Sequence, residues 1–358
     1  LSELREHLPC VTSHHHVSDA WELQRHNIES DAIIVGSSQW ADDVCERGVA
    51  PERVVRIPYG VDASRFVPAT ADSRRSARES LDIPADATVV GFFAKLSSNE
   101  RDRKGTDVFV AAATRLARRL PRLVVLIIGP GWDDLVAQLR TAGVTCVWLP
   151  FVRDSARMPL MYQALDFYWV TARVEGGPVT LLEAMSTGLC CVTTPVGLAR
   201  DIVVSNVNGV VVPFGDAESF AERTFALAKN AQARTAMGRA ARKTILDTMD
   251  LPITAPGVRT AYDVAASQFL ARTGMEITPS SAPVPEAVLN RIAVLEELTW
   301  AEALNLQGQR ALAYRTILSA WLTHPLSSLP PRFLLRNLLP QRLVRAIVRA
   351  RPGNAAAQ

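Results

Sequence analysis

The chain has 358 residues, of which 48% are hydrophobic and 21% are charged, and its formal net charge is +3. This composition is that of an ordinary globular protein large enough for two domains, and no uninterrupted apolar run reaches the roughly 18 residues that a membrane-spanning helix needs. The five cysteines have neither metal-ligand spacing nor the pattern of a disulfide framework, which indicates reduced thiols in a cytoplasmic protein.

The first 70 residues alternate short apolar runs with helical patterns. Strands are predicted at 10–12, 32–36 and 54–58, and helices at 19–29 and 39–47. Because three strands do not make an independent sheet covered on both faces, residues 1–70 are interpreted as part of a Rossmann-like domain whose earlier strands are missing. The chain begins with Leu1, and we expect it to be a fragment of a longer polypeptide. Residues 71–88 are predicted to be a linker.

Residues 89–248 continue the same alternation through a whole domain. Near-continuous apolar runs that are separated by helical patterns indicate a parallel sheet covered on both faces. The predicted strands are 89–94, 123–129, 146–149, 166–171, 190–194 and 209–212. This pattern predicts a complete doubly wound α/β domain, whose ligand is expected at the carboxyl ends of the strands.

The βα alternation stops after residue 248. Residues 249–277 are predicted to be a helical region, 278–285 a linker, and 286–358 a helical, basic extension. From residue 303 onward there are eight arginines and no acidic residue, so the rest of the chain has a net charge of −5. Arg332–Arg351 alternates arginine with apolar residues at helical spacing, which suits an anionic membrane surface, an acidic partner, or simply packing against the main body.

The segment from Glu175 to Glu183 carries the strongest functional signal. Gly176 and Gly177 let the backbone approach a ligand closely, and Pro178 suits the first turn of a helix. A helix N-terminus attracts an anion, here through the amides of Val179, Thr180 and Leu181, and two carboxylates beside it can accept hydrogen bonds from hydroxyl groups. Phosphate and hydroxyl recognition together predict a sugar nucleotide as the ligand.

Several further motifs occur in a fixed order. They are Ile57–Asp62 followed by Phe66, Gly91–Leu96 followed by Lys104 and Gly105, Ile128–Gly131 with its turn glycine Gly129, and the Glu-x7-Glu pair Glu175 and Glu183. In this order they resemble the GT-B retaining glycosyltransferases of the group 1 family, over residues 11–228, with Tyr59 standing where the family has asparagine. The resemblance implies a GT-B fold of two Rossmann-like domains, of which 89–248 would bind the donor.

The resemblance also implies roles for single residues. Two cations bind the donor diphosphate in the family, and Lys95 and Lys104 occupy those positions. Lys95 stands where arginine is more frequent and its spacing from Lys104 is longer than usual, so Arg101 or Arg103 is an alternative to Lys95. Glu183 would bind the donor ribose and Glu175 the transferred sugar.

Three histidines, His14, His15 and His16, follow the first predicted strand at a place where relatives carry a histidine near the acceptor. Strand alternation turns His14 or His16 toward the cleft, and His14 is preferred. Adjacent side chains point in different directions, so no more than two would share a metal ion. Ordinary loop histidines are the alternative interpretation. The resemblance implies that neither a metal nor another cofactor is needed, because relatives neutralise the leaving group with side chains.

The sequence therefore predicts a retaining, metal-independent glycosyltransferase that moves a hexose-type sugar from a nucleotide-sugar donor to a glycan or lipid-linked acceptor in bacterial cell-surface synthesis. Its expected location is the cytoplasm, peripheral to the inner face of the membrane. The alternatives are a GT-B sugar-nucleotide epimerase or phosphorylase, and a non-catalytic sugar-nucleotide-binding fragment. A nucleic-acid partner is not expected, because the basic tail lacks interleaved aromatic residues.

Overall fold

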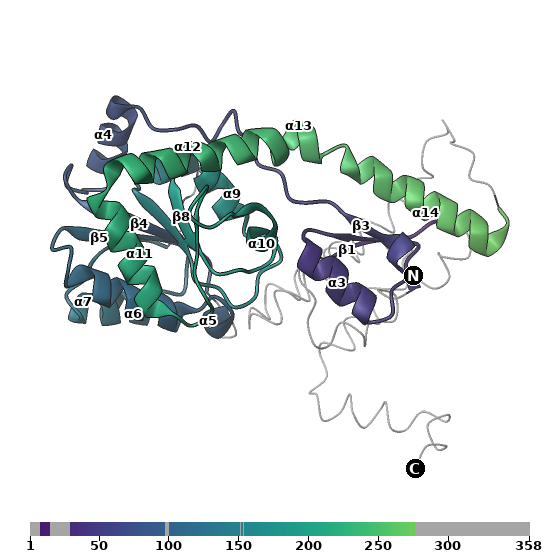
Figure 1. The fold of residues 1–358 in the computed structure, drawn as a ribbon, viewed down its shortest axis with the longest axis horizontal. Coiled ribbons are helices and arrows are strands. Elements are labelled where there is room, and N and C mark those ends of the chain that lie inside the picture. The colour runs from purple at the N-terminus through teal and green to yellow at the C-terminus, as the bar shows by residue number, and fades with distance from the viewer. Residues whose placement is uncertain (1–7, 15–28, 97–99, 151, 153, 276–358) are drawn as a thin grey trace, which may run out of the picture. The chain divides into compact units, whose positions relative to one another are not determined.

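A computed structural model describes residues 8–14, 29–96, 100–150, 152 and 154–275 (Figure 1). The chain divides into two compact units, Leu1–Ile277 and Thr278–Gln358, and every described residue belongs to the first. The predicted linker at 278–285, the extension at 286–358 with its membrane-binding segment, and nearly all of the helix predicted at 19–29 lie outside the described residues. Within the described part, no helix has the length and apolar character to cross a membrane.

A six-stranded parallel sheet forms the larger layer of the fold. Its strand order is β6-β5-β4-β7-β8-β9. The bounds are β4 Thr88–Phe93, β5 Leu123–Ile128, β6 Thr145–Leu149, β7 Phe167–Val170, β8 Cys190–Thr193 and β9 Val210–Val211. This is the order of a Rossmann sheet, in which the strand order reverses between β4 and β7, and ligands bind beside that reversal. The predicted doubly wound domain is confirmed.

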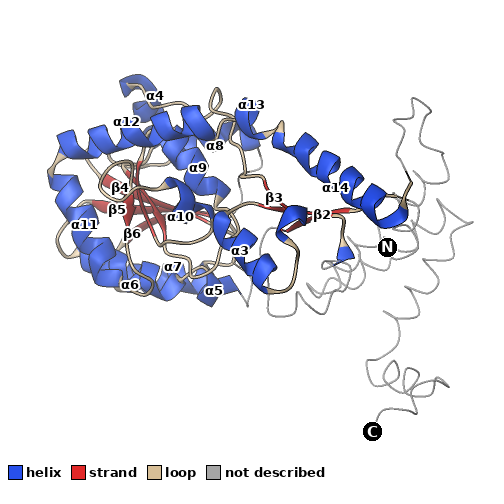
Figure 2. Ribbon diagram, turned by 45° about the vertical axis from the view of Figure 1, so that its right-hand side comes forward, coloured by secondary structure: helices blue, strands red, loops and turns tan. Residues whose placement is uncertain are grey.

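Helices cover both faces of this sheet (Figure 2). The strand β5 shows why, because Val124 and Leu126 belong to one buried cluster while Val125 and Ile127 belong to the other. One face packs on α6 Thr106–Ala117, α7 Asp133–Thr141 and α11 Ala217–Lys229. The other packs on α4 Ala71–Glu79, α8 Met158–Gln163, α9 Val179–Ser186, α10 Leu198–Ile202 and α12 Ala231–Thr248.

The segment predicted as a linker, 71–88, contains the helix α4. Thr70 caps this helix by accepting a hydrogen bond from the amide of Ser73 at 3.1 Å, and the Ser73 hydroxyl accepts one from the amide of Thr70 at 3.0 Å. Ala77 packs into the core of the six-stranded sheet, and Arg78 pairs with Asp166 at 2.9 Å. The helix thus forms part of the covering layer of that sheet.

A second sheet of three parallel strands lies in the same unit, in the order β1-β2-β3. Its strands are β1 Val11–His14, β2 Ala32–Val35 and β3 Val54–Arg56. It packs against α3 Ser38–Glu46 and, after the short helix α13 Leu251–Thr254, against α14 Gly257–Thr273 (Figure 1). Arg272 of α14 pairs with the buried Asp31 just before β2 at 3.2 Å, which attaches the returning helix to this sheet.

Short helical turns complete the described structure. They are the helix α5 Glu100–Arg103 and the 3-10 turns Pro51–Arg53 and Ser155–Arg157. The first of these lies between β4 and α6, directly before Lys104. It therefore belongs to the connection that carries one of the predicted cations.

Candidate donor-binding site

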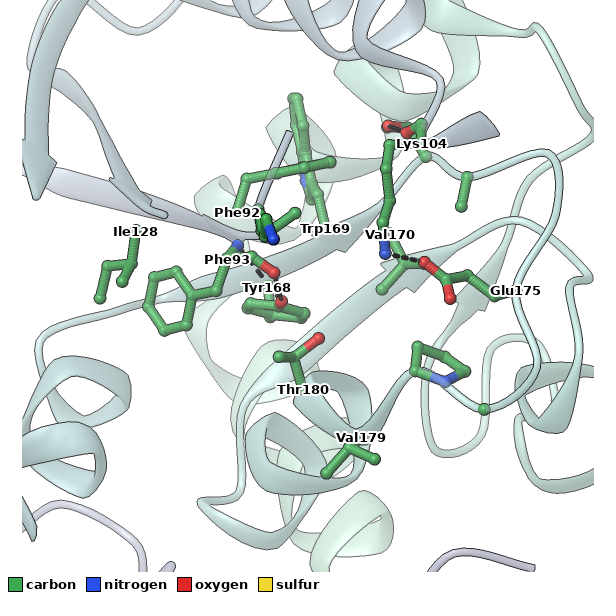
Figure 3. A pocket seen from close by; sticks show the side chains of 16 residues that line it. Phe92, Phe93, Lys104, Ile128, Tyr168, Trp169, Val170, Glu175, Val179 and Thr180 are labelled. Atoms are coloured by element: carbon green, nitrogen blue, oxygen red, sulfur yellow. Dashed lines mark hydrogen bonds and ion pairs between the residues drawn. The ribbon is translucent and has the colours of Figure 1, made fainter. Parts of the chain in front are cut away.

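A cavity of about 410 Å³ opens at the carboxyl ends of β4 and β7, where the strand order of the sheet reverses. Its floor consists of Phe92 and Phe93 from β4 and of residues 168–170 from β7. Lys95, Lys104, Glu175 and the start of α9 line the rest (Figure 3). Segments far apart in the sequence therefore meet at the place where a doubly wound sheet binds its ligand.

The central feature of the cavity is an ion pair between the Nζ atom of Lys104 and the Oε1 atom of Glu175 (Figure 3). Both side chains are largely shielded from water, with exposed fractions of 19% and 12%. Arg103 adds a second positive charge, since its Nη1 atom lies 3.9 Å from Oε2 of Glu175. Partial exclusion of water strengthens such interactions relative to those on the surface, so the site presents concentrated charge to a ligand.

Backbone contacts explain why Lys104 and Glu175 meet. The Thr171 hydroxyl donates to the carbonyl oxygens of Lys104 and Gly105, both at 3.0 Å. The amide of Arg173 donates to the carbonyl of Arg103 at 2.8 Å. The chain between β7 and α9 is therefore attached directly to the chain between α5 and α6, which brings the two charged side chains together.

The N-terminus of α9 forms the opposite wall of the cavity. Its N-cap residue, Pro178, makes no side-chain cap hydrogen bond, and Val179 and Thr180 both line the cavity. The amide of Leu181 departs from the prediction, because it donates to the carbonyl of Pro178 at 2.8 Å and its side chain is fully buried. The amides of Val179 and Thr180 are therefore the groups positioned for an anion.

Gly177, just before α9, is required by close packing. A Cβ atom on Gly177 would overlap the ring of Tyr59, and one on Gly36 at the end of β2 would overlap the same ring. Burial and the nearby charge of Glu175 raise the pKa of Tyr59 above its usual value. The residue that replaces the asparagine of the family motif therefore lies beside the Gly176–Gly177 turn and close to Glu175.

The carboxylate of Glu183 lies one turn further along α9. It accepts a hydrogen bond from the hydroxyl of the fully buried Tyr162 at 2.5 Å. Burial raises the pKa of Glu183 above 4.5, against the opposing effects of the Tyr162 hydrogen bond and the charge of Arg65. Glu183 is not among the residues that line the cavity, although it shares the helix whose first residues do.

Replacing Glu183 with glutamine is expected to stabilise the protein at neutral pH. A carboxyl group whose pKa is raised in the folded state stabilises the fold below its unfolded pKa, and this contribution is lost as pH rises through the folded pKa. Glutamine keeps an acceptor for Tyr162 and does not titrate. The melting temperature of the variant minus that of the wild type should therefore increase between pH 4 and pH 7.5, and a difference that is equal at the two pH values would contradict this.

The remaining predicted residues lie at varying distances from the ion pair. Lys95 is exposed, lines the cavity and has no hydrogen bond or ion pair among the described residues. Of its two alternatives, Arg101 is bound by both oxygens of Asp134, at 2.5 and 2.6 Å, whereas Arg103 lies near Glu175. Arg103 also pairs with Glu100 at 2.7 Å and does not line the cavity, so among the described residues Lys95 is the unpaired cation beside Lys104.

His14 and Gly129 do not line the cavity. His14 ends β1, and its neighbours His15 and His16 lie outside the described residues. Gly129 follows β5 with φ of +132°, and a Cβ atom there would overlap the carbonyl of Ala94, which does line the cavity. Gly129 thus shapes the wall from behind. Within the described ranges, no three His, Cys, Asp or Glu side chains group as metal ligands.

Sequence reasoning missed Thr171, Tyr168 and Tyr162. Thr171 is a polar residue at the carboxyl end of a buried strand, a signal that could have identified it. The two tyrosines are fully buried and resemble ordinary core residues in the sequence. Only the structure shows that the hydroxyl of Tyr162 donates to Glu183 of α9, and that of Tyr168 to the carbonyl of Phe93 in β4.

Comparisons with known proteins support the fold and the family. Sucrose-phosphate synthase from Thermosynechococcus elongatus matches 73% of this chain and 69% of its own, with a TM-score of 0.62 and 19% identity. Anabaena HepE in complex with UDP-glucose matches 71% of this chain and 72% of its own, with a TM-score of 0.62 and 20% identity. The fold is that of the GT-B glycosyltransferases, as predicted.

Residues 73–244 match the model of the family described as Glycosyl transferases group 1. It is 31% identical over 230 residues to a D-inositol 3-phosphate glycosyltransferase of Saccharomonospora viridis, covering 60% of this chain and 51% of that protein. It is also 31% identical over 232 residues to the Salinispora tropica protein of the same name, covering 60% and 47%. The chain spans about half the length of these curated relatives.

Proposed function

We propose that this chain contains the donor half of a retaining, metal-independent transfer site, which moves a sugar from a nucleotide-sugar donor to an acceptor hydroxyl. The observation that supports this most strongly is the shielded pair of Lys104 and Glu175, which faces the uncapped N-terminus of α9 across one cavity. Positive charge and free amides suit a diphosphate, and a carboxylate beside them suits the hydroxyl groups of a sugar.

The chemistry follows from where charge develops. As the bond between the sugar and the diphosphate breaks, negative charge grows on the leaving diphosphate while the sugar becomes oxocarbenium-like. Lys104, Lys95 and the amides of α9 would stabilise the leaving group without a metal ion. Glu175 would hold the transferred sugar and Glu183 the ribose.

Nucleotide binding can be tested without knowing the acceptor. Thermal denaturation is measured with UDP, GDP, ADP and TDP for the wild type, for Glu183→Ala and for Glu222→Ala, a control that removes a half-exposed carboxylate from α11. A ligand at a hundredfold excess over its Kd stabilises a protein by about 2.7 kcal/mol, or roughly 5–10 °C here.

We expect one nucleotide to raise the melting temperature of the wild type and of Glu222→Ala, and to have a much smaller effect on Glu183→Ala. If no nucleotide raises the melting temperature of the wild type, or if Glu183→Ala responds as strongly, the assignment of the donor site is wrong. The bound complexes of HepE with UDP and UDP-glucose make uridine nucleotides the first choice in the panel.

The acceptor is proposed to be a hydroxyl of a glycan or lipid-linked sugar in bacterial cell-surface synthesis. The curated relatives are named for D-inositol 3-phosphate, which makes that compound a second acceptor to test. Incubation of the selected nucleotide sugar with each acceptor, followed by analysis of products, separates the two. Products formed only without an acceptor would instead favour the epimerase, and a sugar phosphate formed from inorganic phosphate would favour the phosphorylase.

A further inference from the structure

The first turn of α3, in the three-stranded sheet layer, bonds to the loops of the donor-binding layer through three consecutive residues. The amide of Ser38 donates to Asp201 of α10 at 2.8 Å, and its hydroxyl donates to the same carboxylate. The side chain of Gln39 accepts from the amide of Gly197 at 3.0 Å. α3 and α10 lie side by side in both ribbon views (Figures 1 and 2).

The third residue, Trp40, contacts the loop that carries the ion pair. Its indole Nε1 donates to the carbonyl oxygen of Glu175 at 3.0 Å, and this bond is buried. A buried carbonyl that loses its donor is left without a hydrogen-bond partner, which is costly in the folded state. The main chain of Glu175 is therefore held by a residue from a different sheet layer.

The indole itself has little freedom to move. Trp40 is 5% exposed and belongs to the buried cluster with Ile33, Val35, Val44 and Val49 of the three-stranded layer. Val174, the residue directly before Glu175, packs against this same cluster. One core thus fixes both the donor group of the hydrogen bond and the chain that leads to its acceptor.

The loop is also confined from the other sides. A Cβ atom on Gly197, where φ is +49°, would overlap the carbonyl oxygens of Glu175 and Gly176, and the ring of Tyr59 lies against Gly177. These contacts restrict the backbone at Glu175, and the indole of Trp40 satisfies its carbonyl oxygen. A shift of this backbone would carry the carboxylate away from Lys104.

We propose that Trp40 is a positioning residue, which holds the backbone of Glu175 so that its carboxylate meets Lys104 and the transferred sugar. This inference rests on the proposed function, because the position of the Glu175 carboxylate is taken to matter for sugar transfer. Small displacements of a catalytic group cost large factors in rate. Trp40 thereby makes the geometry of the donor site depend on the three-stranded layer.

The kinetic test is Trp40→Phe, which keeps an aromatic ring in the core and removes the N–H donor. Cleavage of a nucleotide sugar that carries the nucleotide selected by the thermal panel should show kcat about tenfold lower, the equivalent of one net hydrogen bond. The KM for the donor and the stabilisation by the free nucleotide should stay near the wild-type values, since Trp40 does not line the cavity.

A double-mutant cycle separates positioning from a general structural effect. In a Glu175→Gln background, measured in single turnover, Trp40→Phe should lower the rate little further, because its effect passes through the missing carboxylate. The same tenfold loss in both backgrounds would overturn the proposal. If Trp40→Phe folds poorly, the same cycle is measured with Gln39→Ala. This variant removes the hydrogen bond between Gln39 and the amide of Gly197 and leaves the core side chains in place.

Hydrogen exchange provides a readout that does not depend on activity. Trp40→Phe should speed amide exchange in residues 172–177, whereas the matched variant Trp148→Phe, which loses an indole bond of 2.9 Å to Gly129, should speed exchange near residues 129–131 instead. Unchanged exchange at 172–177 would overturn the positioning role. If the wild type cleaves no nucleotide sugar, the proposed function fails, while this exchange result still decides whether Trp40 holds the loop.

Discussion

Lys104→Met is expected to lower kcat/KM for sugar transfer by about two to three orders of magnitude, the usual cost of removing one group that stabilises developing charge in a shielded site. Methionine keeps most of the side-chain length and removes the positive charge that would face the diphosphate. It also leaves Glu175 with only the more distant Arg103 as a positive neighbour, at 3.9 Å. Steady-state kinetics with the selected nucleotide sugar measure the effect.

The matched control is Lys243→Met, because Lys243 also pairs with a carboxylate, that of Asp247 at 2.5 Å, but lies exposed on α12. It should retain the wild-type kcat/KM. If Lys104→Met also retains it, another cation stabilises the leaving group, and Lys95 becomes the first residue to test. If only KM rises while kcat is unchanged, Lys104 binds donor and transition state equally well.

Gly105→Ala is expected to destabilise the protein by about 2–5 kcal/mol, the sum of a left-handed conformation for alanine and of steric overlap in a packed region. Gly105 has φ of +62° and precedes α6, and a Cβ atom there would overlap the backbone carbonyl of Thr171. Relief requires movement of the chain that carries Lys104. Transfer activity should therefore fall together with the melting temperature.

Gly143→Ala is the appropriate comparison, because Gly143 has φ of +81° but no heavy atom within 4 Å of the added Cβ. That variant should cost only about 1–2 kcal/mol, which is the conformational term alone. Urea denaturation of both variants measures the difference. Equal losses of unfolding free energy would mean that the chain at Thr171 moves easily to make room for the Cβ atom. The contact between Gly105 and Thr171 would then not hold Lys104 in place.

Much of the fold could be predicted from the sequence because each strand of the larger sheet is a short, near-continuous apolar run. β5 is such a run, and its parallel pairing with β4 and β6 is what the doubly wound pattern predicts. The start of α9 was also readable, since the turn of Gly177 and Pro178 is a local signal. A single sequence reveals strands, turns and helix starts, because these depend mainly on residues that are close together in the chain.

Contacts between distant segments were not predictable in the same way. Nothing near Trp40 indicates that its indole bonds to Glu175, which is 135 residues away. The hydroxyl of Tyr162 reaches Glu183 only because α8 and α9 pack on the same face of the sheet. The amide of Leu181 was also not predictable, because a helix start in the sequence does not tell which of its first amides bond to carbonyls of the same turn.

The attachment of Lys104 has a consequence for how the domain tolerates changes in loop length. Thr171, just after β7, holds the peptide groups of Lys104 and Gly105, and the amide of Arg173 holds that of Arg103, so the lysine is placed by the chain between β7 and α9. We therefore expect insertions or deletions in the stretch between Lys95 and Glu100 to leave the position of the lysine unaltered. The length of that connection would then vary independently of where the cation stands.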